Sequence, residues 1–359
     1  MSTILKNNFN SAIIGIGHPL FDLIVTNVDQ EFLHRYQLES DDAILADNER
    51  HQILCDELIE NFNDIQFVPG GSIQNTIRVA QWFFDQPNVC TIFGCIGNDD
   101  FGHQMKCKIE QEDHVKSVYC IDNTRPTGKC VCLINVDSNG SHHRSLVTFL
   151  DACHGFRMEI LQQNLSLFNN TRIIYTSGFF LISNPDCVQL LAELCRKSSN
   201  DIKFALNLSA SYVVKNHSQR LLQIFPYVDL LFGNENEAFA LAETLEWDKD
   251  DKIDDIVEKM AHLESKKTNR TVIITQGPEE IIVVSTNSSV QKFSVPSIPT
   301  GEIIDTNGSG DAFVGGFLAY HLTGHSMIDC INAGTYAAQQ VIRCCGCTLP
   351  ESNELRLSN

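Results

Sequence analysis

Residues 305–317 read Asp-Thr-Asn-Gly-Ser-Gly-Asp-Ala-Phe-Val-Gly-Gly-Phe. Gly308 and Gly310 flank the small residue Ser309, and the carboxylate of Asp311 then precedes an apolar, helix-like run. Such a loop can direct backbone N–H groups and a helix N-terminus at an anion. A carboxylate beside a bound anion suits the transfer of a phosphoryl group to an alcohol. The same residues also suit an ordinary helix start, with the acid as a simple cap.

A second glycine-rich motif opens another predicted helix. Gly70 and Gly71 allow the backbone to approach a ligand closely, and Ser72 and Asn75 lie one helical turn apart. Both side chains can therefore point a polar group at the same ligand. The alternative interpretation is a plain helix start capped by Ser72.

A third motif follows an apolar strand. Asn234 and Glu237 are three residues apart at the start of a predicted helix, so both side chains face the same way. Amide and carboxylate oxygens in that position suit a hard cation such as Mg²⁺, held through water. An acidic residue paired with the helix dipole is the alternative. Thr275, Gln276 and Gly277 end a further predicted strand, which suggests a turn on the nucleotide side.

Two isolated charged residues complete the candidates. Asp22 stands between Phe21 and Leu23, where its carboxylate can bind a vicinal diol through two hydrogen bonds. A surface acid at a strand end is the alternative. Arg144 follows a predicted hairpin turn, from which it can reach a phosphate, although most isolated arginines are simply solvated.

Short apolar runs alternate with amphipathic, helix-like runs along most of the chain. This alternation predicts an α/β fold with a doubly wound, mostly parallel sheet and helices on both faces. Ligands of such sheets lie beyond the carboxyl ends of the strands, where the glycine-rich loops fall. The expected strands are 13–17, 89–97, 173–181, 204–209, 228–233, 271–276 and 281–285.

Some strand-like segments lack a covering helix and predict a small β-sheet lid. They are residues 21–26 with 43–46, and 129–136 with 145–149, the second pair joined by a hairpin-like turn. The expected large domain comprises residues 1–19, 47–122 and 151–359, and the expected lid domain comprises residues 20–46 and 123–150.

Composition limits the partners. The 359 residues include 26 lysines and arginines against 45 acidic residues, a net charge of −19 that disfavours nucleic acids and anionic membranes. No signal peptide or long apolar segment is present, so we expect a cytoplasmic protein, with the nucleus as the alternative. The 14 cysteines are expected to be reduced thiols in the core. Cys344, Cys345 and Cys347 suit packing on a helix end better than a metal site.

Taken together and in this order, the motifs resemble the ribokinase (PfkB) family of sugar and nucleoside kinases. The segments that carry the resemblance are GGSIQNTIRVAQWF at 70–83, RPTGKC at 125–130, SGFFL at 177–181, LNLSASY at 206–212, PYVDLLFGNENEA at 226–238, ITQG at 274–277, IIDTNGSGDAFVGGFLAYHL at 303–322 and AGTYAAQQVIRCCGCTLP at 333–350. The resemblance implies a ribokinase-like fold with a lid that closes over the substrates. It also implies a monomer that uses ATP and Mg²⁺ to phosphorylate a nucleoside 5′-hydroxyl, with adenosine as the expected nucleoside.

The resemblance assigns roles residue by residue. Asp311 matches the general base, the amides of Gly308, Ser309 and Gly310 match the anion hole, and Arg144 matches a lid arginine that reaches the phosphates. The expected nucleoside-binding residues are His18, Asp22, Gly70, Gly71, Ser72, Asn75, Phe180 and Tyr212, with the last two as aromatic neighbours of the purine. The expected nucleotide-side residues are Asn234, Thr275, Gly277 and Asn307, and Glu237 with Asn234 organises Mg²⁺.

The chain departs from the family pattern around the nucleoside. His18 replaces a usual asparagine, and its charge is expected to depend on pH. Ala43 replaces a usual glutamine, Ser309 a usual alanine, Ser211 a usual proline and Tyr212 a usual phenylalanine. The alternatives are therefore another nucleoside or sugar kinase of this family, or a non-catalytic regulator that binds a nucleoside.

Overall fold

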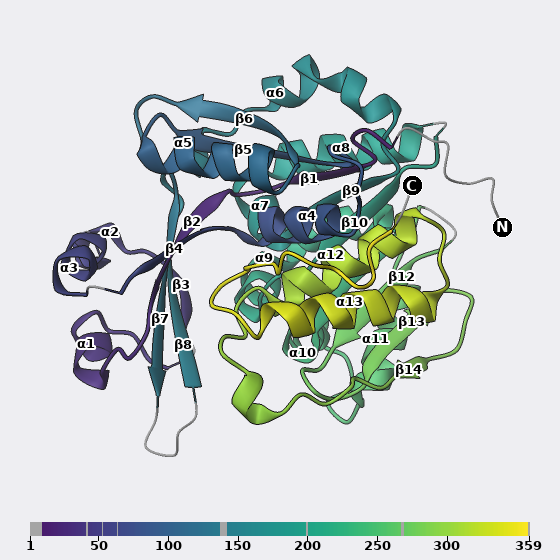
Figure 1. Cartoon of the computed structure of the whole chain (residues 1–359). Helices are drawn as coiled ribbons and strands as arrows, with labels where there is room; N and C mark the ends of the chain where they lie inside the picture. The colour runs from purple at the N-terminus through teal and green to yellow at the C-terminus, as the bar shows by residue number, and fades with distance from the viewer. Residues whose placement is uncertain are drawn as a thin grey trace.

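The computed structural model describes residues 9–357, except residues 41, 52, 63, 137–141, 199 and 267–268. Its main feature is a nine-stranded sheet that is mostly parallel (Figure 1). In spatial order the strands are β14 (Gln291–Phe293), β13 (Ile281–Ser285), β12 (Thr271–Thr275), β11 (Leu230–Asn234), β10 (Lys203–Asn207), β9 (Ile173–Ser177), β1 (Ile13–Ile16), β5 (Cys90–Gly97) and β6 (Lys116–Asp122). At one edge, β13 pairs antiparallel with both β12 and β14, and the other neighbouring strands pair parallel.

Helices cover both faces of this sheet, as predicted. One hydrophobic core contains residues of α4 (Ser72–Trp82), α5 (Asp100–Cys107), α12 (Ser309–Leu322) and α13 (Met327–Val341). The other contains residues of α6 (Met158–Gln163), α7 (Gly178–Ser183), α8 (Pro185–Lys197), α9 (Ser211–Ile224), α10 (Glu235–Thr244) and α11 (Ile253–His262). Successive residues of β1 alternate between the two cores, Ile13 in the first and Ile14 in the second, which is the alternation of a doubly wound sheet.

Short helical turns connect these elements. They are η1 (Lys108–Glu112), η2 (Asp151–Gly155), η3 (Leu165–Asn169), η4 (Phe225–Tyr227) and η5 (Thr300–Glu302). All 14 cysteines are free thiols, as expected. Among the described residues, no helix has both the length and the apolar character that a bilayer crossing requires.

A separate five-stranded sheet stands beside the large one (Figure 1). Its order is β3 (Ala43–Leu45), β8 (His142–Phe149), β7 (Lys129–Val136), β2 (Leu20–Val25) and β4 (Gln66–Gly70). This sheet corresponds to the predicted lid. It has its own core, to which α1 (Gln30–Arg35) and α3 (Leu54–Asn61) contribute, and α2 (Asn48–His51) lies between β3 and α3.

The lid sheet includes a strand, β4, that lies outside the expected lid residues 20–46 and 123–150. β4 pairs with β2, although residues 47–122 were assigned to the large domain, and α1 and α3 cover strands that were expected to lack helices. The sequence signal for β4 is weak, because the strand is short and contains Pro69, a residue that only an edge strand tolerates well. We propose that the lid domain extends through residue 70.

Other strand boundaries also differ from the predictions. β9 ends at Ser177 rather than at Leu181, because the Ser177 hydroxyl accepts a hydrogen bond from Phe180 N at 3.3 Å and caps α7. The strands β6 and β14 were not predicted, and β8 begins at His142, three residues before the predicted start.

Gly315 and Gly316 allow α12 to pack closely against its neighbours. A Cβ atom at Gly315 would lie 2.7 Å from the carbonyl oxygen of Thr76 on α4, and one at Gly316 would lie 2.4 Å from that of Ala333 on α13. Close helix packing therefore explains these glycines, and the N-termini of α4 and α12 are brought together.

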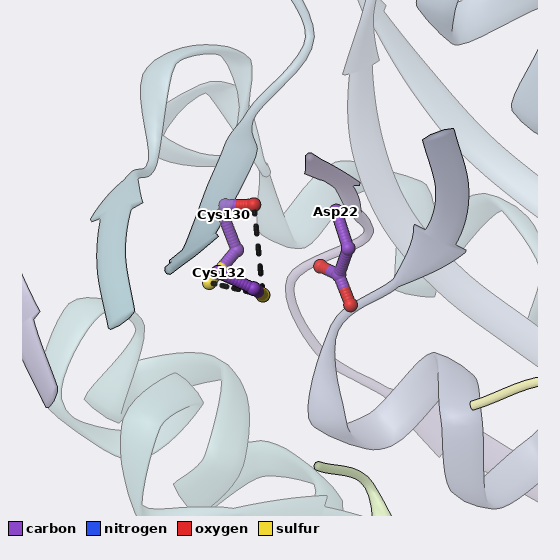
Figure 2. A group of neighbouring side chains, drawn as sticks. All are labelled: Asp22, Cys130 and Cys132. Carbon is purple, nitrogen blue, oxygen red and sulfur yellow. Dashed lines mark hydrogen bonds between the residues drawn. The ribbon is translucent and has the colours of Figure 1, made fainter. Parts of the chain in front are cut away.

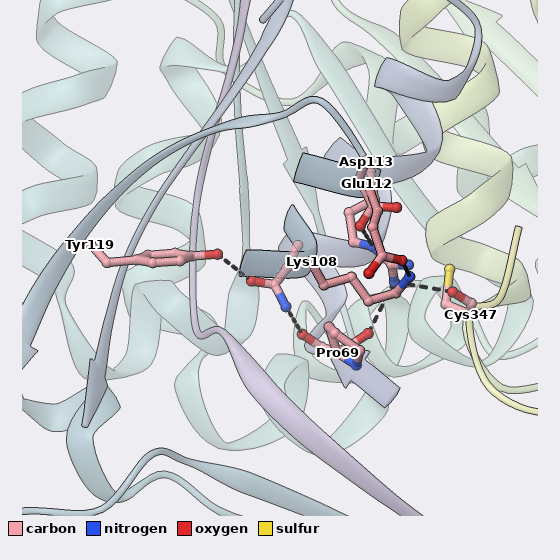
Figure 3. Close-up of polar contacts among 9 residues, drawn as sticks. Pro69, Lys108, Glu112, Asp113, Tyr119 and Cys347 are labelled. Carbon is pink, nitrogen blue, oxygen red and sulfur yellow. Dashed lines mark hydrogen bonds and ion pairs between the residues drawn. The ribbon is translucent and has the colours of Figure 1, made fainter. Parts of the chain in front are cut away.

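The side chain of Arg78 joins three parts of the chain near the lid. It is buried on α4, and its Nε donates to Asp113 Oδ2 at 2.7 Å. Its Nη1 donates to the carbonyl oxygens of Pro69 on β4 at 3.0 Å and Cys347 at 3.1 Å. Figure 3 shows Asp113, Pro69 and Cys347 converging at one point. Arg78 therefore ties the last lid strand to the C-terminal loop of the large domain.

We expect Arg78→Met to destabilise the protein by about 3–5 kcal/mol, because it leaves the half-buried Asp113 and two buried carbonyl groups without their partner. Urea unfolding followed by circular dichroism measures this change. Lys197→Met is the matched control, because it removes a cation from an exposed ion pair with Glu193 and should change stability little. Equal stability of the two variants would contradict a structural role for Arg78.

Candidate active site

One cavity of about 430 Å³ lies between the lid sheet and the large domain. Strand ends and helix starts of the large sheet form one wall, and β2, β3, β7 and β8 contribute residues to the other. The predicted site residues that line it are His18, Asp22, Gly71, Ser72, Asn75, Arg144, Tyr212, Asn234, Glu237, Thr275, Asn307, Gly308, Ser309, Gly310 and Asp311. Gly70, Phe180 and Gly277 are not among the lining residues.

The glycine-rich loop at 308–310 forms the start of α12. Gly308 has a φ of 74° and precedes the helix, while a Cβ atom at Gly310 would meet open space. The N-terminus of α12 thus opens toward the cavity, the geometry expected for an anion site. The Ser309 amide donates to the Thr306 carbonyl at 3.3 Å, so the predicted anion hole would exchange this long bond for a ligand contact.

Asp311 lies in the first turn of α12 and is held by two residues of α4. Ser72 Oγ donates to Asp311 Oδ1 at 2.7 Å, and Asn75 Nδ2 donates to Asp311 Oδ2 at 3.2 Å. Burial raises the pKa of Asp311 to about 6, against the lowering effect of these bonds and of Arg144. Asp311 is therefore ionised at neutral pH, and its pKa suits a general base.

Asn75 carries an unsatisfied group in the same place. Its Oδ1 is buried and has no hydrogen-bond partner among the described residues. A buried carbonyl oxygen without a partner is costly, so this atom indicates a ligand that donates a hydrogen bond there.

Asp22 is buried, with 3% of its surface exposed, so the surface-acid alternative is wrong. Burial raises its pKa well above the usual range, and nearby Cys130 and Asp311 act in the same direction. Gly70 leaves room for this side chain, because a Cβ atom there would lie 2.2 Å from the Asp22 carboxyl group. Gly70 therefore does not line the cavity, but its lack of a side chain leaves the space that the Asp22 carboxyl group occupies.

His18 lies in the cavity wall and is neutral near pH 7. Burial, with a smaller contribution from His154, lowers its pKa to about 4. Its Nε2 is hydrogen-bonded to Ser183 Oγ at 2.8 Å. The expectation that its charge changes with pH is therefore wrong for the neutral range.

The aromatic wall contains Phe179 instead of the predicted Phe180. Phe180 is fully buried in the core and packs against Phe156 with ring centroids 5.2 Å apart. The prediction treated 173–181 as one strand, whereas the helical turn of α7 sends Phe179 to the cavity. The rings of Phe179 and Tyr212 are 6.2 Å apart and tilted by 38°.

Asn234 and Glu237 form a capping box at the start of α10. The Asn234 amide accepts from Glu237 N at 2.9 Å and donates to Glu237 Oε1 at 3.0 Å, and Asn234 N donates to Glu237 Oε2 at 3.0 Å. Burial raises the pKa of Glu237 to about 7. These side chains therefore cap a helix start, and both also line the cavity. Their role with Mg²⁺ stays a prediction. Thr275 lines it too, whereas Gly277 only forms the turn beyond, with a φ of 59°.

Arg144 reaches from the lid to the loop before α12. Its Nη1 donates to Thr306 Oγ1 at 3.2 Å and lies 4.0 Å from Asp305 Oδ1. Asn307 lies next to this contact, and its backbone amide donates to Asp305 Oδ1 at 2.8 Å. The guanidinium group of Arg144 therefore already lies beside the predicted anion site.

Some lining residues were not predicted. Asn207 ends β10 and lines the cavity, and its place at the carboxyl end of a parallel strand was the available signal. Ile44, Leu45 and Leu146 extend the apolar lid wall. No sequence pattern distinguished these from ordinary sheet residues.

A model of the pfkB family of carbohydrate kinases matches residues 41–354. The chain belongs to this family. Adenosine kinase 1 of Arabidopsis thaliana is 36% identical over 351 residues, which cover 96% of this chain and 98% of that protein. The family predicted from the motifs is confirmed.

Solved structures of family members share the fold. Anopheles gambiae adenosine kinase in complex with P1,P4-di(adenosine-5) tetraphosphate has a TM-score of 0.87 and 34% identity, covering 96% of this chain and 99% of that chain. Schistosoma mansoni adenosine kinase in complex with adenosine and AMP has a TM-score of 0.84 and 29% identity, covering 95% of this chain and 98% of that chain. The predicted ribokinase-like fold is confirmed.

We expect kcat/KM to rise with pH on the acid side, with a midpoint near 6, because Asp311, the predicted general base, must lose its proton. Ser72→Ala should move this midpoint upward by about one pH unit, because a hydrogen bond that favours the carboxylate is lost. A pH profile of initial rates measures both. Ser288→Ala, on an exposed turn far from the cavity, is the control. An unchanged midpoint in Ser72→Ala would contradict the assignment of this titration to Asp311.

Proposed function

We propose that this chain transfers the γ-phosphoryl group of ATP to the 5′-hydroxyl of adenosine, giving AMP and ADP. The observation that carries the proposal is the cluster around Asp311, in which a carboxylate at a helix N-terminus shares one cavity with Asp22 and the unsatisfied Asn75 Oδ1. A base, an anion site and a diol-binding pair are the parts that nucleoside phosphorylation requires.

The residues suggest the following sequence of events. Asp22 and Asn75 bind the ribose hydroxyls and place the 5′-oxygen near Asp311. Asp311 accepts the hydroxyl proton while that oxygen attacks the γ-phosphorus of ATP. The start of α12 and Arg144 stabilise the negative charge on the transferred group. Closure of the lid excludes water, which limits hydrolysis of ATP.

Mg²⁺ fits this site only through water. Asn234 and Glu237 already satisfy one another in the capping box, so direct coordination would break the start of α10. The carboxylate of Glu237 retains further acceptor sites, and we propose that it accepts hydrogen bonds from water bound to the ion. When bound with ATP, Mg²⁺ would neutralise phosphate charge.

The aromatic and apolar walls favour a nucleoside over a plain sugar. Phe179 and Tyr212 stand on one side of the cavity and the lid residues Ile44 and Leu45 line it as well. A flat purine base can stack on the aromatic rings and bury the apolar side chains, whereas a sugar alone would leave these surfaces exposed to water. The curated and structural relatives named as adenosine kinases support the same choice.

The cellular and assembly expectations stay predictions. A cytoplasmic or nuclear location, a monomeric state and the lack of nucleic-acid or membrane partners follow from composition and from the family resemblance alone.

Asp311→Asn should keep the fold and lower kcat by roughly 10²–10⁴, because the general base is lost. A coupled assay of ADP formation with adenosine, ATP and Mg²⁺ measures the rate, and circular dichroism verifies the fold. Near-normal turnover would remove Asp311 from this role. Tight adenosine binding by the unaltered protein without any ADP formation would instead support a non-catalytic regulator.

Phe179→Ala should raise KM for adenosine by about tenfold with little change in kcat. The reason is that it removes a contact with the adenine ring that is made equally in the ground state and the transition state. Phe239→Ala, which truncates an exposed ring on α10, is the matched control. The same assay over other nucleosides, ribose and fructose tests the alternative substrate. A clear preference for a plain sugar would contradict the adenosine proposal.

A further inference from the structure

Two cysteines and one acid meet on the cavity side of the lid sheet. The Sγ atoms of Cys130 and Cys132 are 4.0 Å apart, and a carboxylate oxygen of Asp22 lies within 4.8 Å of both. Figure 2 shows Asp22 facing Cys130 and Cys132. Among the described residues, this is the one group of three or more His, Cys, Asp or Glu side chains whose ligand atoms are this close.

The strand register places these groups together. Cys130 and Cys132 are two residues apart on β7, so their side chains emerge on the same face. β2 runs parallel to β7, with Asp22 directly opposite Cys130. All three side chains are buried, and Asp22 and Cys130 line the cavity, so the cluster is reachable from it. The arrangement is built into the sheet and needs no loop to form it.

The sulfur separation matches a known coordination geometry. Tetrahedral zinc with Zn–S bonds of about 2.3 Å places two thiolates about 3.8 Å apart, close to the distance observed here. A carboxylate oxygen completes a third ligand position, and the cavity leaves a fourth position open to water. Thiolates select soft or borderline cations and disfavour Mg²⁺. This cluster would therefore bind a different class of cation from the Mg²⁺ that accompanies ATP.

Charges of both signs surround the cluster, and two side chains donate hydrogen bonds to its sulfurs. Asp305 and Asp311 contribute negative charge near Asp22, whereas Arg78 and Arg144 contribute positive charge near Asp22 and Cys130. Thr148 Oγ1 lies 3.6 Å from Cys130 Sγ, and Asn307 Nδ2 lies 3.6 Å from Cys132 Sγ, both as donors. Donors to ligating sulfurs stabilise the thiolate form and fix its orientation.

We propose that Asp22, Cys130 and Cys132 form a binding site for a soft divalent cation such as Zn²⁺ or Cd²⁺. Binding forms two metal–thiolate bonds and one metal–carboxylate bond. Each thiol releases one proton to solvent, as does the Asp22 carboxyl group whenever it is protonated. The site regulates the enzyme, because a metal on Asp22 removes the carboxylate that binds the ribose diol. This last step rests on the proposed function, whereas the metal site itself does not.

Titration of the full chain with Cd²⁺ tests the site directly. With a phosphine reductant present, we expect one equivalent to produce the ultraviolet thiolate-to-cadmium charge-transfer band. Cys132→Ser should weaken this binding by at least tenfold. Cys107→Ser, which removes an exposed thiol elsewhere, should leave it unchanged. Absence of the band, or equal binding by Cys132→Ser, would overturn the proposal. Near-ultraviolet circular dichroism shows whether each variant is folded.

Competition with adenosine tests the regulatory step separately. Excess adenosine should weaken the apparent Cd²⁺ affinity of the unaltered protein, and substoichiometric Zn²⁺ should raise KM for adenosine in a way that Cys132→Ser abolishes. Cadmium binding that adenosine does not affect would support the metal site and overturn the shared use of Asp22. Catalysis without cadmium binding would overturn the site and leave the proposed kinase activity standing.

Discussion

The hydrogen bond from Ser72 to Asp311 joins residues that are 239 positions apart in the chain. It forms because α4 and α12 pack almost backbone to backbone through Gly315, which sets their N-termini side by side. The two glycine-rich motifs lie at the starts of these two helices. A single packing contact therefore brings both helix starts to one cavity, as the proposed transfer from phosphoryl donor to acceptor requires.

Much of this organisation was readable from sequence. The alternation of strands and helices predicted the doubly wound sheet, and the strand-like segments without a covering helix predicted the lid. Most of the motif residues do line the cavity, because the carboxyl ends of parallel strands and the following helix starts converge at one edge. These features follow from local periodicity and from a topological rule, so one sequence was sufficient to infer them.

The features that the sequence did not predict correctly depend on the geometry of single residues or on packing between distant parts of the chain. Phe180 and Phe179 are adjacent, and only the cap at Ser177 decides which ring faces the cavity. β4 becomes a strand only by pairing with β2, since its own residues carry a weak signal. The pKa of His18 is lowered by burial, which no local pattern reveals. The cluster of Asp22, Cys130 and Cys132 likewise arises from the register between two strands. In the sequence, the spacing of cysteines suggested a possible metal site only at 344–347.

Gly71 has a φ of 90°, and a Cβ atom there would lie 2.2 Å from the carbonyl oxygen of His18. The two residues belong to separate passages of the chain between the large domain and the lid, one from β1 to β2 and the other from β4 to α4. At this point the passages touch through their backbones alone. A Cβ atom at residue 71 would push these two passages apart. The absence of a single methyl group there thus lets the two connections between the domains run in backbone contact.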